Sequence, residues 1–213
     1  MKILVIRHGY SKGNEMNVFC GKTEVPLTEL GIEQGKLVSE YVYNNYKIDA
    51  IYTSGLERTK KTIERLAELS GLEIISLEEF NEKSLGRWEG KGFKEIKELY
   101  PEEYDWQFSD PMTFKPVGGE DYFELVERVK RGLDKAFDKN GQGDQTIVLT
   151  AHGGTIRALE LIACNMDRQA FGVKLQQNAT VTIMEYDGEK LKIIERGISS
   201  FLGEKETSGV VKL

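Results

Sequence analysis

The sequence is poor in the residues that mark several large classes of protein. Two cysteines, Cys20 and Cys164, are all that 213 residues contain. Their wide separation fits neither a disulfide-rich scaffold nor a CxxC zinc site. No apolar run is long enough to span a membrane, and the one at the N-terminus is too short for a signal peptide. We therefore expect a cytoplasmic protein with reduced thiols and no membrane partner.

A basic surplus is also missing. The chain has 29 Lys and Arg residues against 35 Asp and Glu, a net charge of −6. Proteins that bind nucleic acid backbones usually carry a basic face, so no nucleic-acid partner is expected. A small positive pocket for one anion is still compatible with this balance. With 39% hydrophobic residues, no internal repeat and no linker, residues 1–213 are predicted to form a single domain.

Strands and helices alternate along most of the chain. The predicted strands are residues 2–6, 49–53, 73–77 and 145–150, followed by a hairpin of residues 179–186 and 190–196 around Asp187-Gly188. The predicted helices are residues 28–46, 56–70, 122–140 and 155–165. This alternation predicts an α/β fold, a three-layer α/β/α sandwich whose mostly parallel sheet has helices on both faces.

Residues 80–118 break the alternation. This segment holds both tryptophans and three of the four prolines. It is predicted to be a small helical insertion over the active site, with short helices near residues 93–100 and 102–108. Two interpretations of its aromatic residues stay open: they line a substrate pocket, or most of them pack the insertion onto the sheet. The residues concerned are Trp88, Phe93, Tyr100, Tyr104, Trp106 and Phe108.

The only two histidines occupy the same kind of position. His8 and His152 each follow an apolar strand and precede a glycine, and Arg7 lies beside His8. Arg58 and Glu82 follow two further strands. Ligands of an open parallel sheet bind outside the carboxyl ends of its strands, so these side chains can converge on one crevice. A lone histidine there is more often structural, but cations, an imidazole nucleophile and a carboxylic acid together suit phosphoryl transfer.

Six segments in order strengthen this hypothesis. They are Arg7-His8-Gly9, the PLTELG run from Pro26, the SGLERTKKT run from Ser54, the NEKSLGRWEG run from Asn81, Gly118-Gly119-Glu120, and His152-Gly153-Gly154. The pattern resembles the histidine phosphatase superfamily, also called the phosphoglycerate mutase-like family. Each segment alone is a weak signal, whereas the ordered set is specific and covers nearly the whole chain.

The resemblance implies a role for each matching residue. His8 would be the nucleophile and form a phosphohistidine, while Glu82 would protonate the leaving group and later accept a proton from water. The groups expected to hold the phosphorylated substrate are Arg7, Arg58, His152, Asn14, Gly153, Gly21, Lys22 and Tyr10. No metal and no other cofactor is expected, because arginines would stabilise the phosphoryl charge. Inorganic phosphate or vanadate should bind at the same place.

Tyr10 departs from the family pattern. It stands where the family often has Glu or Gln. Two interpretations of it are open: it narrows the pocket mouth or stacks on an aromatic leaving group, or it simply faces solvent.

The reaction predicted is hydrolysis of a small phosphorylated metabolite. Mutases of this family carry a basic pair in the insertion and a longer tail, whereas residues 109–117 offer only Lys115. The stretch from Phe19 to Thr28 resembles the α-ribazole phosphatase branch, which is hard to separate from broad-specificity relatives. A cofactor-dependent phosphoglycerate mutase is the first alternative. A non-catalytic phospho-ligand-binding module is the second, although such a module would be expected to lack His8 or Glu82. A homodimer is left open.

Overall fold

The computed structural model describes residues 1–140 and 144–206. The strands are β1 (Lys2–Arg7), β2 (Ala50–Thr53), β3 (Ile74–Ser76), β4 (Thr146–Ala151), β5 (Val181–Tyr186) and β6 (Leu191–Ile198). The α-helices are α1 (Lys12–Met16), α2 (Glu29–Asn45), α3 (Glu57–Ser70), α4 (Phe93–Leu99), α5 (Pro101–Ser109), α6 (Tyr122–Asn140) and α7 (Gly153–Ala163). Short 3₁₀ helices lie at Glu78–Phe80, Gly86–Trp88, Arg168–Gly172 and Gly203–Lys205.

The six strands form one sheet in the order β3-β2-β4-β1-β5-β6. β1 pairs in parallel with β4, and β2 pairs in parallel with both β4 and β3. β5 runs antiparallel to both of its neighbours, β1 and β6, and forms the predicted hairpin with β6. The mostly parallel sheet is therefore confirmed. The β1–β4 register places Arg7 beside Ala151, so the residues that follow, His8 and His152, leave the sheet at the same edge.

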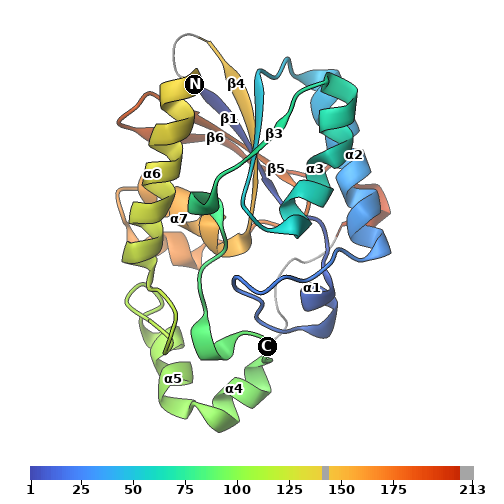
Figure 1. Ribbon diagram of the computed structural model, residues 1–213. Helices are drawn as coiled ribbons and strands as arrows, with labels where there is room; N and C mark the ends of the chain where they lie inside the picture. Colours follow the sequence, from blue (N-terminus) through green and yellow to red (C-terminus); the bar gives the residue numbers. More distant parts are fainter. Residues whose placement is uncertain (141–143, 207–213) are drawn as a thin grey trace.

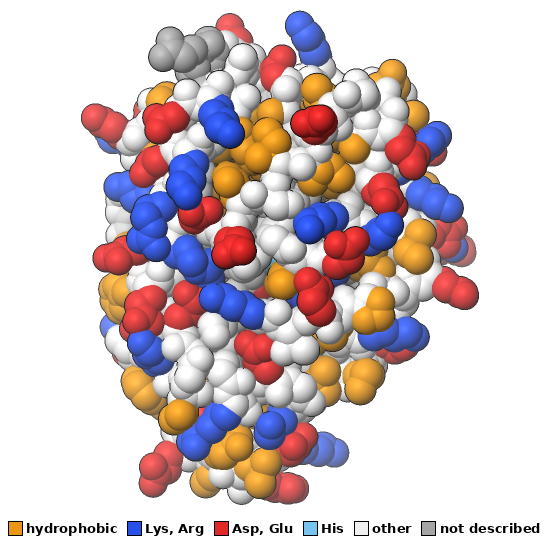
Figure 2. Space-filling model, viewed as in Figure 1, with side chains coloured by type: hydrophobic (Ala, Val, Ile, Leu, Met, Phe, Trp, Pro, Cys, Tyr) orange, Lys and Arg blue, Asp and Glu red, His pale blue; other side chains and the backbone are white. Residues whose placement is uncertain are grey.

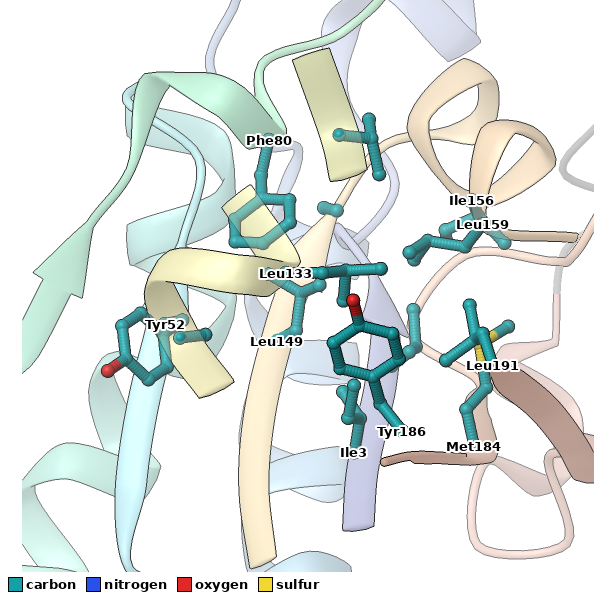
Figure 3. Packing of buried hydrophobic residues seen from close by; sticks show 14 of the residues in the cluster. Ile3, Tyr52, Phe80, Leu133, Leu149, Ile156, Leu159, Met184, Tyr186 and Leu191 are labelled. Atoms are coloured by element: carbon teal, nitrogen blue, oxygen red, sulfur yellow. The ribbon is translucent and has the colours of Figure 1, made fainter. Parts of the chain in front are cut away.

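Helices cover both faces of the sheet, as the alternation predicted (Figure 1). On one face, Ile3 and Leu149 pack with Leu133 of α6 and Ile156 of α7 (Figure 3). On the other, Leu4 and Ile51 pack with side chains of α2 and α3, namely Val38, Val42, Ile63 and Leu66. Successive residues of a strand point to opposite faces, so a strand covered on both sides must be apolar at nearly every position. The uninterrupted apolar run of β1 meets that requirement.

Several element boundaries follow from local capping chemistry. The Thr28 hydroxyl accepts a hydrogen bond from the Gly31 amide at 3.1 Å and caps the start of α2. Gly71, at φ 70°, ends α3 in the left-handed conformation that glycine adopts without strain. The Asp121 carboxylate accepts from the Glu124 amide at 2.9 Å at the start of α6. Sequence inspection missed α1, a helix of 5 residues capped by Ser11.

Residues 80–118 lie beyond the carboxyl ends of the parallel strands, where α4 and α5 form the lower end of the molecule in Figure 1. Their own small core contains Trp88, Ile96 and Phe114, against which Phe19 packs. The Trp88 indole donates to the Glu103 carboxylate at 2.6 Å. The segment therefore has internal packing that holds it beside the sheet edge.

Acidic and basic side chains are interspersed over the face seen in Figure 2, without a large patch of one sign. This distribution agrees with the modest net charge of −6. Within the described part of the chain, no helix combines the length and the apolar character that crossing a bilayer would take.

Candidate active site

The two histidines meet at the carboxyl edge of the sheet. Their ring centroids are 5.2 Å apart, with the planes inclined by 58°. His8 is 6% exposed and His152 is fully buried. The convergence expected from their positions after β1 and β4 is thus found in the structure, and it follows from the pairing of those two strands.

The hydrogen bonding of His8 determines which nitrogen can react. Its Nδ1 lies 2.7 Å from the Gly9 carbonyl oxygen. Because a carbonyl only accepts, Nδ1 carries the proton and Nε2 keeps its lone pair. Burial and then the Arg58 and Arg7 guanidinium groups hold the pKa of His8 well below its usual value of 6.5. His8 is therefore a neutral imidazole whose Nε2 has a free lone pair.

His152 is the other neutral tautomer. Arg58 Nε donates to its Nδ1 at 3.2 Å, so the proton is on Nε2, which lies 2.7 Å from the Ser54 hydroxyl. The Ser54 hydroxyl in turn hydrogen-bonds with the Thr59 hydroxyl at 2.9 Å. Burial, followed by the charge of Arg58, also keeps the pKa of His152 well below 6.5. In this arrangement the His152 ring orients the Arg58 guanidinium through Nδ1. His152 could donate a hydrogen bond to a phosphoryl oxygen only if Nδ1 carried a proton.

Two buried guanidinium groups supply positive charge beside His8. Arg58 also donates to the carbonyl groups of Thr23 at 2.9 Å and Gly21 at 2.8 Å. Arg7 donates to the Gln176 carbonyl at 2.7 Å. Burial lowers the pKa of Arg7 to about 10, so it remains protonated at neutral pH.

Glu82 is held at the N-terminus of α7. Its Oε2 accepts from the Gly154 amide at 3.1 Å, and its Oε1 accepts from the Lys83 amide at 2.7 Å. The loop that carries it is fixed by Arg128, which donates to the Asn81 carbonyl at 3.0 Å and pairs with Glu120 at 2.5 Å. The carboxylate thus has a defined position and still has acceptor capacity.

A cavity of about 260 Å³ joins these groups. Its walls include the predicted residues Arg7, His8, Asn14, Gly21, Arg58, Glu82 and Gly153. His152 lies beside it as the buried neighbour of His8 and Arg58.

Tyr10 and Lys22 are not among the residues that line the cavity. Instead, the Tyr10 amide donates to the Gln34 side chain within α2, and the Tyr10 carbonyl accepts from the amide of Thr28, which precedes α2. The Lys22 side chain is exposed, and its amide donates to Glu89 at 3.1 Å. The cavity lining therefore gives no support to the expectation that Tyr10 and Lys22 hold the substrate.

The aromatic residues of segment 80–118 divide between the two interpretations. Trp88, Phe93 and Phe108 line the cavity, whereas Tyr100, Tyr104 and Trp106 are not part of its walls. Trp88 fits both interpretations: it lines the cavity, and at 1% exposure it is also buried in the core of the segment.

Sequence inspection missed residues that hold the site from a distance. Asn178 donates to the His8 carbonyl at 2.8 Å, and the Gln176 carbonyl accepts a hydrogen bond from Arg7. Both come from the segment before β5, which carries no motif. Lys83 also lines the cavity, and its position beside Glu82 was the one available signal.

Comparison with known proteins identifies the relatives of this chain. Phosphoserine phosphatase 1 of Hydrogenobacter thermophilus is 28% identical over 204 residues, covering 96% of this chain and 95% of that protein. Phosphoglycerate mutase-like protein 4 of Arabidopsis thaliana is 32% identical over 207 residues, covering 95% and 87%. The solved structure of Bacillus stearothermophilus YhfR superposes with a TM-score of 0.87 at 25% identity, covering 94% of this chain and 98% of that one.

The family model "Histidine phosphatase superfamily (branch 1)" matches residues 3–198. That span contains both histidines, Arg7, Arg58 and Glu82. The match, the relatives and the fold agree with the family inferred from the six ordered segments. The chain belongs to branch 1 of the histidine phosphatase superfamily.

Proposed function

We propose that the protein hydrolyses phosphomonoesters of small metabolites through a phosphohistidine on His8. The observation that carries this proposal is the neutral His8, whose Nδ1 is bonded to Gly9 and whose Nε2 keeps a lone pair beside two guanidinium groups and Glu82. A positioned nucleophile, cations and an acid are what stepwise phosphoryl transfer needs. The phosphatases among the relatives support the same reaction.

The reaction would proceed in two displacements. His8 Nε2 attacks phosphorus, the bond to the leaving oxygen breaks, and that oxygen takes a proton from Glu82, which enters the reaction as the protonated carboxylic acid. The Glu82 carboxylate then removes a proton from water as the water oxygen attacks the phosphohistidine. The P–N bond breaks and inorganic phosphate is released, so His8 and Glu82 return to their starting states.

The non-bridging oxygens would be held by fixed donors. Arg7 and Arg58 supply the charge, and Asn14 and the Gly153 amide at the start of α7 supply further donors. His152 would act first through Arg58, which it orients. These contacts need no metal, and the two arginines serve as the electrostatic clamp. We also propose that residues 1–213 form one domain, with segment 80–118 forming the outer wall of its site.

Hydrolysis is favoured over mutase activity by the same segment. Lys115, the one basic residue of 109–117, is exposed and pairs with Glu124 at 2.6 Å. The C-terminal tail, which is longer in mutases of this family, corresponds here to residues 207–213, and these lie outside the described residues. Incubation with 3-phosphoglycerate separates the two: inorganic phosphate is expected, whereas 2-phosphoglycerate would favour the mutase.

The intermediate can be tested directly. Native protein is mixed with p-nitrophenyl phosphate without added metal, quenched within one turnover and examined by mass spectrometry under neutral conditions. One acid-labile phosphoryl group on His8 is expected, and vanadate should compete with the substrate. Phosphate on another residue, or turnover with no phosphoenzyme in any quench, would overturn the proposal. A screen of phosphorylated metabolites, α-ribazole 5′-phosphate included, would identify the substrate.

A further inference from the structure

Glu89 lies in the NEKSLGRWEG run of segment 80–118, and the proposed mechanism gives its side chain no role. Its half-buried carboxylate joins that segment to the loop at residues 21–23. Oε2 accepts from the Thr23 amide at 3.0 Å and from the Thr23 hydroxyl at 2.5 Å. Oε1 accepts from the amides of Lys22 and Leu85, each at 3.1 Å. A carboxylate offers about four acceptor positions, so these four bonds use its capacity.

The loop that Glu89 holds carries two acceptors of the Arg58 guanidinium. Arg58 donates to the Gly21 carbonyl at 2.8 Å and to the Thr23 carbonyl at 2.9 Å. Thr23 therefore bonds to Arg58 through its carbonyl and to Glu89 through its amide and hydroxyl. Arg58 is 2% exposed, and a buried donor that loses its partner has no water to replace it. The position of the loop therefore sets the position of the guanidinium.

The carboxylate also packs directly against the backbone of the loop. Gly21 has a φ of 49°, and a Cβ at this position would lie 2.2 Å from Glu89 Oε1. Any other residue there would be strained and would displace the carboxylate. Glycine thus allows the close approach of the carboxylate and the loop.

We propose that Glu89 is a positioning residue for phosphoryl transfer, which fixes the Arg58 guanidinium through residues 21–23. The inference rests on the proposed function, in which Arg58 stabilises the phosphoryl charge. Of the residues that the structure describes, Glu89 is not one that lines the cavity, so it would act through Arg58 and not by contact with the substrate. Charges stabilise a transition state best when they are already in place, so loosening the loop should cost rate.

Glu89→Gln tests this assignment, because the amide keeps the size of the side chain but turns an N–H₂ group toward donors. In this variant kcat/KM for p-nitrophenyl phosphate should fall about 10²-fold, the cost of a displacement on the ångström scale. In an Arg58→Ala background the same change should cost no more than about twofold, because the group through which Glu89 acts is gone. An unchanged kcat/KM in Glu89→Gln, or equal losses in both backgrounds, would overturn the inference.

A second readout does not depend on activity. Arg58 Nε donates to His152 Nδ1 at 3.2 Å, and the chain has only two histidines. Their ¹⁵N NMR signals can therefore be assigned with His8→Ala. In Glu89→Gln the His152 Nδ1 resonance should move toward that of a ring nitrogen without a donor. An unchanged resonance would mean that Arg58 keeps its place without Glu89, which contradicts the proposal.

Glu103 offers a matched control in the same segment. Its carboxylate accepts from the Trp88 indole at 2.6 Å and pairs with Arg87 at 2.8 Å, and none of its hydrogen bonds within the described chain goes to residues 21–23. Glu103→Gln should lower the thermal stability and leave the His152 Nδ1 resonance where it is. If Glu89 only held the segment together, both variants would shift that resonance alike, and the positioning role would be rejected.

Thr23→Val keeps the proposal testable where Glu89→Gln does not fold. Thr23 is exposed, and valine removes only its hydroxyl bond to Glu89 while keeping the carbonyl that Arg58 uses. A loss in kcat/KM of roughly three- to tenfold is expected, the net value of a typical hydrogen bond. The His152 Nδ1 resonance should shift in the same direction as in Glu89→Gln, by less. No loss and no shift would overturn the inference.

The native protein separates this inference from the proposed function. Native protein that hydrolyses p-nitrophenyl phosphate, together with an unaffected Glu89→Gln, would reject the role of Glu89 and leave the phosphatase function standing. Native protein inactive on every phosphomonoester would reject both.

Discussion

The carboxyl edge of the sheet and segment 80–118 form two walls of one cavity, and they are built differently. At the sheet edge, the β1–β4 register fixes Arg7 and His8 through buried hydrogen bonds. In the segment, short helices present aromatic side chains, and Phe108 is 50% exposed. The difference indicates a division of labour. In the proposed mechanism, the sheet edge would place the reacting atoms and the aromatic wall would contact the leaving group.

The largest effect is expected at the sheet edge. His8→Ala removes the proposed nucleophile, so kcat for p-nitrophenyl phosphate should fall by at least about 10⁴-fold, as for other nucleophile deletions. Steady-state assays measure the loss. Circular dichroism checks that the fold is intact. Activity close to that of the native protein would show that His8 is not the nucleophile and would leave the sheet edge with no special role in the chemistry.

Glu82→Gln should give a loss that depends on the leaving group. General acid catalysis contributes typically about 10²–10⁴-fold. For a poor alkoxide leaving group the loss in kcat should approach that range, whereas p-nitrophenolate departs with little protonation and should lose far less. Rates with both esters provide the comparison. Equal losses would mean that Glu82 does not act as the acid.

Gly154→Ala should perturb the position of Glu82. A Cβ at Gly154 would lie 2.4 Å from Glu82 Oε1, so the carboxyl must move. A displacement on the ångström scale can cost about 10²-fold in rate. The helix itself favours alanine over glycine, so thermal stability should not fall in parallel. Gly172→Ala, where nothing lies within 4 Å of the added Cβ, is the matched control. Unchanged kcat in Gly154→Ala would argue that Glu82 tolerates repositioning.

The buried imidazoles should make stability depend on pH. In the folded protein the pKa values of His8 and His152 lie well below 6.5, whereas the unfolded chain binds protons near pH 6.5. The free energy of unfolding should therefore fall as pH falls, by about 1 kcal/mol per histidine between pH 7.0 and 5.5. Urea denaturation at the two pH values measures it. In His8→Ala the pH-dependent loss should be about half as large. A constant free energy of unfolding would contradict the neutral state of both rings.

The aromatic wall should give the smallest effect on chemistry. Phe108→Ala removes a half-exposed ring that contacts Tyr104 at a centroid distance of 4.7 Å. KM for aryl phosphates should rise a few-fold, with kcat changed less, because a ground-state contact is lost. Leu99→Ala, an exposed apolar residue of the same segment outside the cavity, should change neither constant. If Phe108→Ala lowered kcat as much as Glu82→Gln does, the proposed division of roles between the sheet edge and the aromatic wall would be wrong.

Local signals in the sequence determined the order of the elements and most of their boundaries. Thr28, Gly71 and Asp121 act on helix ends through neighbours a few residues away, so their effects can be predicted without the fold. The apolar run of β1 predicted a strand covered on both faces. Placement after strands, together with the ordered family segments, predicted where Arg7 and His8 would meet His152.

Only the tertiary structure decided the chemical state of the site. The tautomer of His152 depends on Arg58, which is 94 residues away in the chain. The burial of Lys83 depends on Phe114 and Tyr122. Tyr10, beside the motif, is outside the cavity walls. Periodicity and capping act between near neighbours in sequence, whereas protonation, burial and access to a cavity depend on groups that folding brings together from distant parts of the chain.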